Sequence, residues 1–497
     1  MSSMHHPAKE PFCPLYREVP FQGPFEVYMT VRSKNSLLFE SLKGPEHISR
    51  YAFIGIEPYL MYKVKNGLVE IDCRGRKTVS YRKPLQRLRE LLSAYPQTKV
   101  DELPPFQGGA AGMLSYDFVR YLEKLPETAE DDLNVPDAHF LMFDRVIAFD
   151  CKDGRCWVIV CPGARETALG LTEINSTEAE MLGHAEEQLD RLTQAVAQCP
   201  PSLLKVSDTD VCPDIEYRTG KEEYMAMVRR AKEYIAAGDI FQANLSLRLS
   251  SDIGETDPLR IYSILREVNP SPFAAYIDFG DYHIISSSPE RLVRVMGRAV
   301  DTRPIAGTRP RGRDMSEDDE MRAELLLNEK ERAEHIMLID LERNDLGKVS
   351  DYGSVLVDEL MITEQYSHVI HIVSNVRGDL AKGKDCFDVI RATFPGGTIT
   401  GVPKVRCMEI IEELEQRRRG PYTGSLGYIG FNANMDLNII IRTFLVKEGR
   451  AYVQAGAGIV ADSDPEREYY ESLKKAEALI NTLKRLKAPD AGRGMTL

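Results

Sequence analysis

The chain has 497 residues, of which 43% are hydrophobic and 28% are charged, and its formal net charge is −13. This composition is typical of a globular protein, and the acidic excess argues against nucleic acid or an anionic membrane as the main partner. No apolar run approaches the roughly 20 residues of a membrane span, and the first residues lack the apolar core of a signal peptide. A cytoplasmic protein with no membrane partner is therefore expected.

The chain divides into two regions of different texture. In residues 14–200, strand-like runs such as FEVYMTV and RVIAFDC alternate with turns, and the region closes on an amphipathic helix, EAEMLGHAEEQLDRLTQAVAQ. The Pro-, Ser- and Asp-rich stretch CPPSLLKVSDTDVCPDIEYRT follows and is the best boundary candidate. Residues 217–487 form a second region that is denser in motifs, and residues 488–497 are expected to be a flexible tail.

Two elements open the second region. TGKEEYMAMVRRAKEYIAAGD predicts a helix that begins with a capping box between Thr219 and Glu222. FQANLSLRLS alternates strictly between apolar and polar residues, which predicts a strand with Phe241 and every second residue after it on a packed face and with a polar opposite face.

Two further elements lie near the end of this region. DLNIIIRTFLV is almost continuously apolar and predicts one strand that is covered on both sides. DPEREYYESLKKAEALINTLKRL predicts a helix with Asp464 as its cap and Pro465 in its first position. Many strands with clustered helices, and no regular βαβ rhythm, indicate an α+β architecture.

Several charged residues stand out against these elements. Arg442 lies inside the apolar run NIIIRTF, where it needs either a structural ion pair, the commoner case, or an anionic ligand such as a carboxylate. Glu468 and Glu471 share one face of the last helix, and Glu334 lies where another helix changes from charged to apolar. Carboxylates suit Mg²⁺, but a solvated surface explains each of these glutamates equally well.

Other candidates are weaker when taken one by one. His371 lies in the apolar strand-like run SHVIHIVSNV, where a histidine is usually a satisfied core residue. The glycine-rich runs FPGGTITGVPK and VQAGAGIV could present N–H groups to an anion or could simply form tight turns. Glu290, in SSSPERL, has the setting of an ordinary turn residue.

The order of these motifs resembles that of the chorismate-utilising enzymes, a family that includes anthranilate, aminodeoxychorismate, isochorismate and salicylate synthases. The resemblance is carried by GDIFQANLS, NPSPF, SSSPERL, RPIAGTRPRG, NEKERAEHIMLIDLERNDLGKV, YSHVIHIVSNVRG, FPGGTITGVPKVR, GPYTGSLGY, IIIRT, QAGAGIV and DSDPEREYYESLKKA. LLFESLKGPEHISRYAFIGIE and FQGGAAGMLSYD extend it into the first region. It implies one α+β unit shared by both regions, in which two antiparallel sheets pack together with helices outside and a central cleft.

The resemblance also implies roles for individual residues. Glu334 and Glu471 match the Mg²⁺ ligands, and Glu468 has a supporting position. Glu290 matches the general acid that protonates the departing C4 hydroxyl of chorismate, and His371 lies near the ring.

The remaining matches concern substrate binding. The clamp for the enolpyruvyl carboxylate is matched by Tyr422, Arg442 and the backbone of Gly456 and Gly458. Contacts to the ring side are matched by Gly307 and Thr308 in RPIAGTRPRG.

Two positions bear on the nucleophile and on the product. Isochorismate and salicylate synthases carry a water-activating lysine where this chain has Gln242, and glutamine cannot act as a base, so ammonia is favoured over water. Many aminodeoxychorismate synthases carry a nucleophilic lysine where this chain has Ala306, which favours anthranilate formation or direct attack by ammonia. FQANLSLRLS, FPGGTITG and YTGSLGYIGFN nevertheless resemble the aminodeoxychorismate synthases, including a subgroup with alanine in this loop.

The expected reaction is therefore the synthesis of 4-amino-4-deoxychorismate from chorismate and ammonia, on the route to p-aminobenzoate and folate. Formation of anthranilate and pyruvate, on the route to tryptophan, is the alternative, and a non-catalytic tryptophan-binding subunit is a third reading. No Gly-x-Cys-x-Gly nucleophile is present, so the resemblance implies a separate glutamine amidotransferase subunit that delivers ammonia through a channel.

In anthranilate synthases, a tryptophan pocket forms near the segments that match LLFES, SRYAFIG and NPSPF. The matching residues here are Ser41, Arg50, Tyr51, Pro272, Phe273 and Ala274. The family's Tyr-Met is replaced by Phe273-Ala274, which leaves open whether tryptophan regulates this chain.

Overall fold

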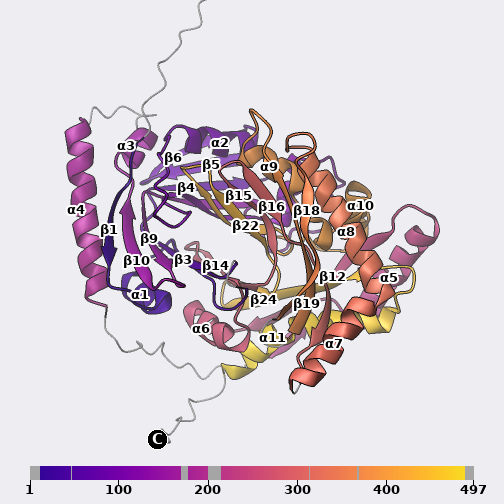
Figure 1. Cartoon of the computed structure of the whole chain (residues 1–497). Coiled ribbons are helices and arrows are strands. Elements are labelled where there is room, and N and C mark those ends of the chain that lie inside the picture. The colour runs from indigo at the N-terminus through magenta and orange to yellow at the C-terminus, as the bar shows by residue number, and fades with distance from the viewer. Residues whose placement is uncertain are drawn as a thin grey trace, which may run out of the picture.

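The computed structural model describes residues 12–45, 48–169, 177–199, 214–312, 314–365 and 369–486. Within them the chain forms two twelve-stranded sheets in which every pairing between neighbouring strands is antiparallel. The prediction of an α+β protein built on two packed antiparallel sheets is confirmed, and Figure 1 shows the strands of both sheets in the centre with helices around them.

The strands of the first sheet run in the spatial order β1 (Leu15–Val19), β10 (Arg155–Val160), β9 (Arg145–Asp150), β3 (Tyr51–Gly55), β2 (Ser36–Glu40), β13 (Phe273–Asp278), β14 (Tyr282–Ser288), β23 (Thr443–Lys447), β24 (Arg450–Ile459), β12 (Gln242–Asp252) and β11 (Ile215–Tyr217), with β20 (Gly401–Val402) on β12.

The strands of the second sheet run in the order β17 (Ile305–Pro310), β19 (Val369–Asp379), β16 (Ala299–Thr302), β15 (Arg291–Met296), β22 (Met435–Ile439), β21 (Ser425–Gly430), β7 (Gly109–Leu114), β8 (Ala138–Phe143), β4 (Leu60–Lys65), β5 (Leu68–Cys73) and β6 (Arg76–Ser80), with β18 (Leu356–Gln365) on β19.

The helices are α1 (Pro24–Val31), α2 (Pro84–Ser93), α3 (Ala164–Leu169), α4 (Glu178–Ala197), α5 (Lys221–Ala236), α6 (Pro258–Val268), α7 (Met315–Leu327), α8 (Glu329–Gly347), α9 (Cys386–Thr393), α10 (Lys404–Leu414) and α11 (Pro465–Arg485), with short 3-10 turns η1 (Tyr116–Tyr121) and η3 (Gly397–Ile399).

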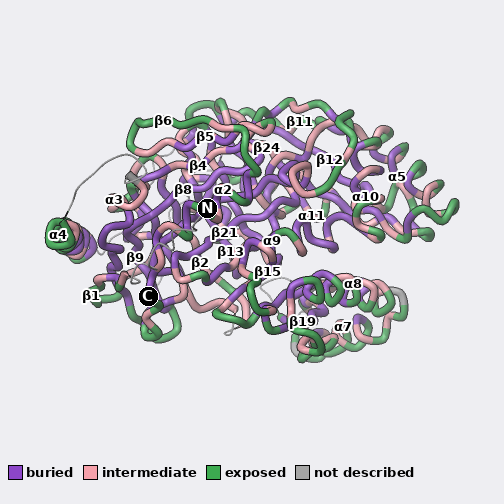
Figure 2. The backbone as a smooth tube through the Cα atoms, turned by 90° about the horizontal axis from the view of Figure 1, so that it is seen from above, coloured by how far each residue is buried: buried purple, intermediate pink, exposed green. Residues whose placement is uncertain are grey.

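Three apolar clusters hold these layers together. One cluster packs α1, α4, α5, α6 and α11 against the outer face of the first sheet, and a second packs α2, α8 and α9 against the outer face of the second sheet. The third lies between the sheets and includes Phe53, Trp157 and Ile284 from the first sheet and Met113 and Leu141 from the second. Figure 2 shows the buried backbone concentrated in the centre, with exposed residues along α4, α7 and α8.

Both sheets contain strands from both sides of the proposed boundary. In the first sheet β2 pairs with β13, and in the second β7 pairs with β21. Most of the boundary stretch CPPSLLKVSDTDVCPDIEYRT, residues 200–213, and the expected tail, residues 488–497, lie outside the described residues, whereas the end of the stretch forms β11. No helix in the described part of the chain combines the length and the apolarity that a bilayer crossing needs.

Two local predictions need correction, and a third is confirmed. The cap of α5 is one residue later than expected, because the Glu223 carboxylate accepts from the N–H of Gly220 at 3.3 Å while Thr219 lies beside Arg248. Phe241, expected on the packed face of its strand, is 70% exposed because β12 begins only at Gln242. The cap of α11 is as predicted, with Asp464 accepting from the N–H of Arg467.

The polar face of β12 is also largely buried. Its residues Ser246, Arg248 and Ser250 are each less than a tenth exposed. Buried polar groups need partners, and here Ser246 donates to Glu415 and Arg248 pairs with Asp132.

The run DLNIIIRTFLV forms two strands rather than one. Its first part is in β22 of the second sheet and its last part is in β23 of the first sheet. Residues 440–442 cross between the sheets. The run is apolar throughout because each half is buried in a different sheet.

Candidate functional site

Two links between the sheets meet at one place. The first runs from Ser288, the end of β14, to Arg291, the start of β15, and contains Glu290. The second contains Arg442. The N–H of Ile439 donates to the carbonyl of Glu290 at 3.0 Å, and the N–H of Ser287 donates to the carbonyl of Arg442 at 3.1 Å, so the two links lie side by side.

Glu290 is a buried acid and not the exposed turn residue that its sequence setting indicated. It is 7% exposed, and burial raises its pKa to about 8. The Thr398 hydroxyl, which donates to Oε1 at 2.9 Å, lowers the pKa, the Glu342 carboxylate on α8 raises it, and the N–H of Ile305 and the charge of Lys475 on α11 lower it. The carboxyl group is therefore protonated at neutral pH and can donate a proton.

Arg442 is a partly buried cation without a carboxylate partner among the described residues. Its backbone has a φ of +53°, and its guanidinium donates to the carbonyl of Lys475. Burial lowers its pKa, and the phenol of Tyr422 opposes that effect. Because a partly buried cation with no carboxylate partner is unfavourable, this position suits an anionic ligand, and the described residues supply no structural ion pair for it.

Two aromatic side chains lie within the electrostatic reach of Arg442. Burial raises the pKa of Tyr422 to about 12, so its hydroxyl remains a neutral donor. Burial lowers the pKa of His371 to about 4, the hydrogen bond to Gly307 opposes this shift, and the charge of Arg442 adds to it. The neutral imidazole places Nδ1 at 3.3 Å from the carbonyl oxygen of Gly307.

The segment RPIAGTRPRG forms β17 and its flanks. The register against β19 shifts between Ala306 and Thr308, and Gly307 at the bulge has a φ of +65°. Thr308 pairs with His371 in this register, while its side chain lies outside the described part of the structure.

The arginines of this segment do not form an open basic surface. Arg303 donates to Glu364 at 2.6 Å, and Arg309 donates to Glu331 at 2.7 Å. Gly307 itself lies against the helices that follow, because a Cβ atom there would be 2.3 Å from Oε2 of Glu331.

Gln242, Gly456 and Gly458 meet where β12 pairs with β24. A Cβ atom on Gly458 would lie 2.3 Å from Nε2 of Gln242, and one on Gly456 would lie 2.3 Å from the carbonyl oxygen of Leu245. The two glycines therefore allow a close approach of side chain and backbone. The Oε1 atom of Gln242 is buried and accepts no hydrogen bond from any described residue.

The expected metal ligands come from two helices. Glu334 on α8 is partly buried, and Glu471 on α11 has a side chain that is 54% exposed, with Oε1 2.8 Å from Nζ of Lys475. Among the described residues no three His, Cys, Asp or Glu side chains form a metal-binding group. Two carboxylates nevertheless suit Mg²⁺, which usually keeps several waters and shares its coordination sphere with the substrate.

Two acidic residues near the site were missed by sequence reasoning. Glu331 lies one turn before Glu334, and its Oε2 is buried without a hydrogen bond from any described residue. The i, i+3 spacing, the same as that of Glu468 and Glu471, could have revealed it. Glu342 is 4% exposed, and burial raises its pKa to about 7, but no motif in the sequence distinguishes it from a surface residue.

A separate cavity of about 450 Å³ lies between the sheets. All six residues of the expected tryptophan pocket line it, namely Ser41, Arg50, Tyr51, Pro272, Phe273 and Ala274. Ser41 donates to the carbonyl of Pro272 at 3.0 Å, and Arg50 pairs with Asp150. Asn438 also lines the cavity, and its Oδ1 has no hydrogen-bond partner among the described residues.

Comparisons with known proteins agree with this geometry. The profile of the chorismate binding enzyme family matches residues 34–481. Aminodeoxychorismate synthase component 1 of Bacillus subtilis (strain 168) is 43% identical over 476 residues, covering 95% of this chain and 97% of the relative. Anthranilate synthase component 1 of Acetivibrio thermocellus is also 43% identical, over 452 residues, covering 90% of this chain and 89% of the relative.

Solved structures show the same relationship. Anthranilate synthase component I from Streptococcus pneumoniae TIGR4 superposes with a TM-score of 0.76 at 36% identity, covering 92% of this chain and 97% of that one. The menaquinone-specific isochorismate synthase MenF of Escherichia coli, at 16% identity and a TM-score of 0.69, shares the fold. From its profile match and its relatives, this chain belongs to the chorismate-binding enzyme family and is an enzyme that uses chorismate.

Proposed function

We propose that this enzyme adds ammonia to chorismate to form 4-amino-4-deoxychorismate, the precursor of p-aminobenzoate in folate biosynthesis. The observation that supports ammonia rather than water as the nucleophile is Gln242, whose buried Oε1 has no hydrogen-bond partner among the described residues. An amide oxygen can accept a hydrogen bond from ammonia but cannot deprotonate water. Ammonia needs no base because it already has a lone pair.

The substrate would be held by the two sides of the site. Arg442 and the hydroxyl of Tyr422 would bind the enolpyruvyl carboxylate, together with the backbone of Gly456 and Gly458, and the partly buried guanidinium would gain the anionic partner that it lacks. The ring would lie against Gly307 and Thr308, with His371 held beside them by its bond to Gly307.

Glu290 would act as the general acid. The C4–O bond breaks as the C–N bond forms, and protonated Glu290 supplies the proton with which the hydroxyl leaves as water. The new ammonium group gives up one proton, which restores the acid form of Glu290, so that ammonia and chorismate yield the amine and water.

Magnesium would be held by Glu334 and Glu471, with Glu468 in support. When bound, the metal would neutralise the ring carboxylate of chorismate. Lys475 already neutralises Glu471, so the ion would have to share this carboxylate with the lysine.

Anthranilate synthesis is the second candidate function. It is favoured by Ala306, which cannot provide the lysine nucleophile that many aminodeoxychorismate synthases use, and by an anthranilate synthase relative at the same 43% identity. The blocks FQANLSLRLS, FPGGTITG and YTGSLGYIGFN support the first function.

The two functions are separated by incubating the purified chain with chorismate, Mg²⁺ and an ammonium salt. We expect a product that becomes p-aminobenzoate only after a pyridoxal-phosphate lyase for aminodeoxychorismate is added. Fluorescent anthranilate in the absence of the lyase would refute the first function. Chorismate left unconsumed, even with an amidotransferase partner, would support a non-catalytic tryptophan-binding role.

We propose that the partner is a glutamine amidotransferase subunit with a Cys-His-Glu triad, which passes ammonia to this chain through a channel. The name "component 1" of the relatives supports a two-component enzyme. Glutamine-dependent turnover should require the partner, whereas ammonium-dependent turnover should not.

The cavity between the sheets is proposed to hold tryptophan. The free acceptor on Asn438 suits an amino group, and the lining aromatic residues suit an indole ring. Calorimetric titration with tryptophan should detect binding, and Ala274→Trp, which fills the cavity, should abolish it. Assays with added tryptophan then decide whether the ligand inhibits the enzyme or only stabilises it.

A further inference from the structure

Arg419 joins several segments that surround the candidate site. It is 2% exposed, and its guanidinium donates to both oxygens of Glu415, at 2.7 and 2.9 Å. It also donates to the carbonyl of Asn244 at 2.6 Å, to the carbonyl of Ile399 at 3.0 Å and to the hydroxyl of Thr423 at 3.2 Å. Five N–H donors in one rigid plane allow a single side chain to hold all these groups.

Each of these segments carries a residue of the site. Asn244 is two residues from Gln242 in β12. Ile399 follows Thr398, whose hydroxyl is bonded to Glu290. Thr423 follows Tyr422, whose ring centre is also 5.7 Å from the guanidinium carbon of Arg419. The buried side chain of Arg419 thus links the segments that carry Gln242, the hydrogen-bond partner of Glu290, and Tyr422.

Glu415 completes this arrangement. Its Oε1 accepts from the N–H and from the hydroxyl of Ser246, both at 2.8 Å, so the carboxylate fixes β12 as well as Arg419. A buried ion pair with satisfied hydrogen bonds is costly to break. The hydrogen bonds of Glu415 to Ser246 and to Arg419 therefore fix the geometry of the Arg419–Glu415 ion pair.

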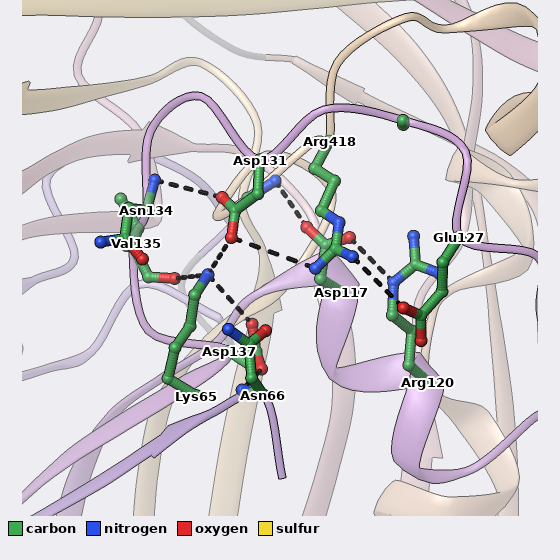
Figure 3. Close-up of polar contacts among 12 residues, drawn as sticks. Lys65, Asn66, Asp117, Arg120, Glu127, Asp131, Asn134, Val135, Asp137 and Arg418 are labelled. Carbon is green, nitrogen blue, oxygen red and sulfur yellow. Dashed lines mark hydrogen bonds and ion pairs between the residues drawn. The ribbon is translucent and has the colours of Figure 1, made fainter. Parts of the chain in front are cut away.

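The turn that carries Arg419 is held from its other side by residues of the first region. The Asp117 carboxylate accepts from the N–H of Gly420 at 2.9 Å. The guanidinium of Arg418 pairs instead with Glu127 and Asp131, at 3.9 and 4.0 Å, as Figure 3 shows. Neighbouring arginines thus have different partners, one among the segments of the site and one among the outer acidic residues.

We infer that Arg419, with Glu415, is a positioning residue that sets the relative placement of Gln242, Glu290 and Tyr422 for the reaction proposed above. The inference rests on that proposed function. Arg419 does not act as a proton donor or as a ligand of the reacting atoms. It aligns the groups that do.

The test is Arg419→Lys, which keeps the charge but replaces the planar fork with a point charge that cannot reach all four segments. With chorismate, Mg²⁺ and an ammonium salt, we expect kcat to fall by roughly 10- to 100-fold, the loss typical of slightly misplaced catalytic groups. KM for chorismate should rise as well, because Tyr422 is displaced. Circular dichroism and thermal melting show whether the variant is folded at the assay temperature.

Arg418→Lys is the matched control, since it makes the same change one residue earlier on a side chain that pairs with the outer acidic residues. Its kcat and KM should stay within about twofold of the wild type. Glu415→Gln should reduce kcat in the same direction as Arg419→Lys, and the double variant should lose less than the sum of the two effects, as expected of coupled residues.

The outcomes separate the inference from the function. If the wild type consumes no chorismate, the proposed function and the inference both fail. If the wild type is active and folded Arg419→Lys matches it in kcat and KM, the inference alone is overturned. A role limited to stability would lower the melting temperature and leave kcat per folded molecule and KM unchanged. Should Arg419→Lys fail to fold, the same criteria apply to Glu415→Gln.

Discussion

At the scale of single residues, the candidate site places two ionisable groups in surroundings that disfavour their charged forms. Glu290 is an acid that retains its proton at neutral pH, and Arg442 is a cation without a carboxylate partner in the described structure. In the proposed reaction both groups would act on an anionic substrate with a poor leaving group bound between them.

The raised pKa of Glu290 predicts a pH dependence of activity. The acid form is present below a pKa of about 8 and is lost as the pH rises through that value, so kcat/KM should decline above about pH 8. Glu342→Gln removes a carboxylate that raises this pKa, and the decline should then begin at a lower pH. A pH profile of the ammonium-dependent reaction measures both. An identical pH profile in Glu342→Gln would contradict the influence of Glu342 on the pKa of Glu290.

Arg442→Met tests whether the partly buried arginine is kept for its ligand. Replacing a partly buried cation that has no carboxylate partner by an apolar side chain of similar volume should raise the melting temperature of the ligand-free enzyme. Stabilisation by chorismate, measured in the presence of Mg²⁺ but without ammonium, should be lost. A lower melting temperature for the variant would indicate that Arg442 has a structural role instead.

At the scale of elements, the site depends on interruptions of regular structure. The links through Glu290 and Arg442 lie where one strand ends in one sheet and the next begins in the other. The bulge at Gly307 brings the backbone of β17 to His371 and to Glu331. Each interruption directs a side chain or a carbonyl towards the candidate site. A strand with uninterrupted pairing would not place these groups there.

Gly307→Ala should show what the bulge requires. Residue 307 has a φ of +65°, and a Cβ atom there would lie 2.3 Å from Oε2 of Glu331. We therefore expect both a loss of stability and a loss of activity. Gly297→Ala is a matched control, because Gly297 has a φ of +62° and open space around its Cβ position. The control should cost on the order of 1–2 kcal/mol of unfolding free energy with unchanged activity. If denaturant titrations show equal losses of unfolding free energy for the two variants, the Glu331 side chain must move away from the new methyl group.

At the scale of the whole molecule, the two sequence regions build the same sheets. β2 supplies the partner of β13, β7 supplies the partner of β21, and the apolar cluster between the sheets draws on both regions. The turn that carries Arg419 is likewise fixed by Asp117 from the first region. The second region therefore depends on the first for partners of its strands, for part of the apolar core, and for the contact that fixes the turn of Arg419.

Expression of residues 217–497 alone tests this dependence. The fragment would expose the paired edge of β13 and one side of the core between the sheets, so we expect it to aggregate or to lack cooperative unfolding. Co-expression with residues 1–216 should restore a soluble complex if the two parts associate. A fragment that melts cooperatively by itself would show that the regions are independent domains.

The sequence alone determined the composition class, the helix of α11 with its cap, and, through the order of its motifs, the family and its fold. These features depend on local patterns or on blocks of residues that keep their order along the chain. The single strand expected over DLNIIIRTFLV is wrong, because apolarity reports burial but not which sheet causes it.

Only the tertiary structure decided which of the charged residues are buried and what they face. Glu290 resembled a turn residue and Glu342 a surface residue, yet both are buried beside the same short segment, next to Thr398 and Gly397. Arg418 and Arg419 are neighbours of the same type, but Arg418 pairs with the outer acidic residues and Arg419 donates to Glu415 and to the carbonyl of Asn244. Burial and electrostatic environment arise from segments far apart in the chain, so no local pattern contains them.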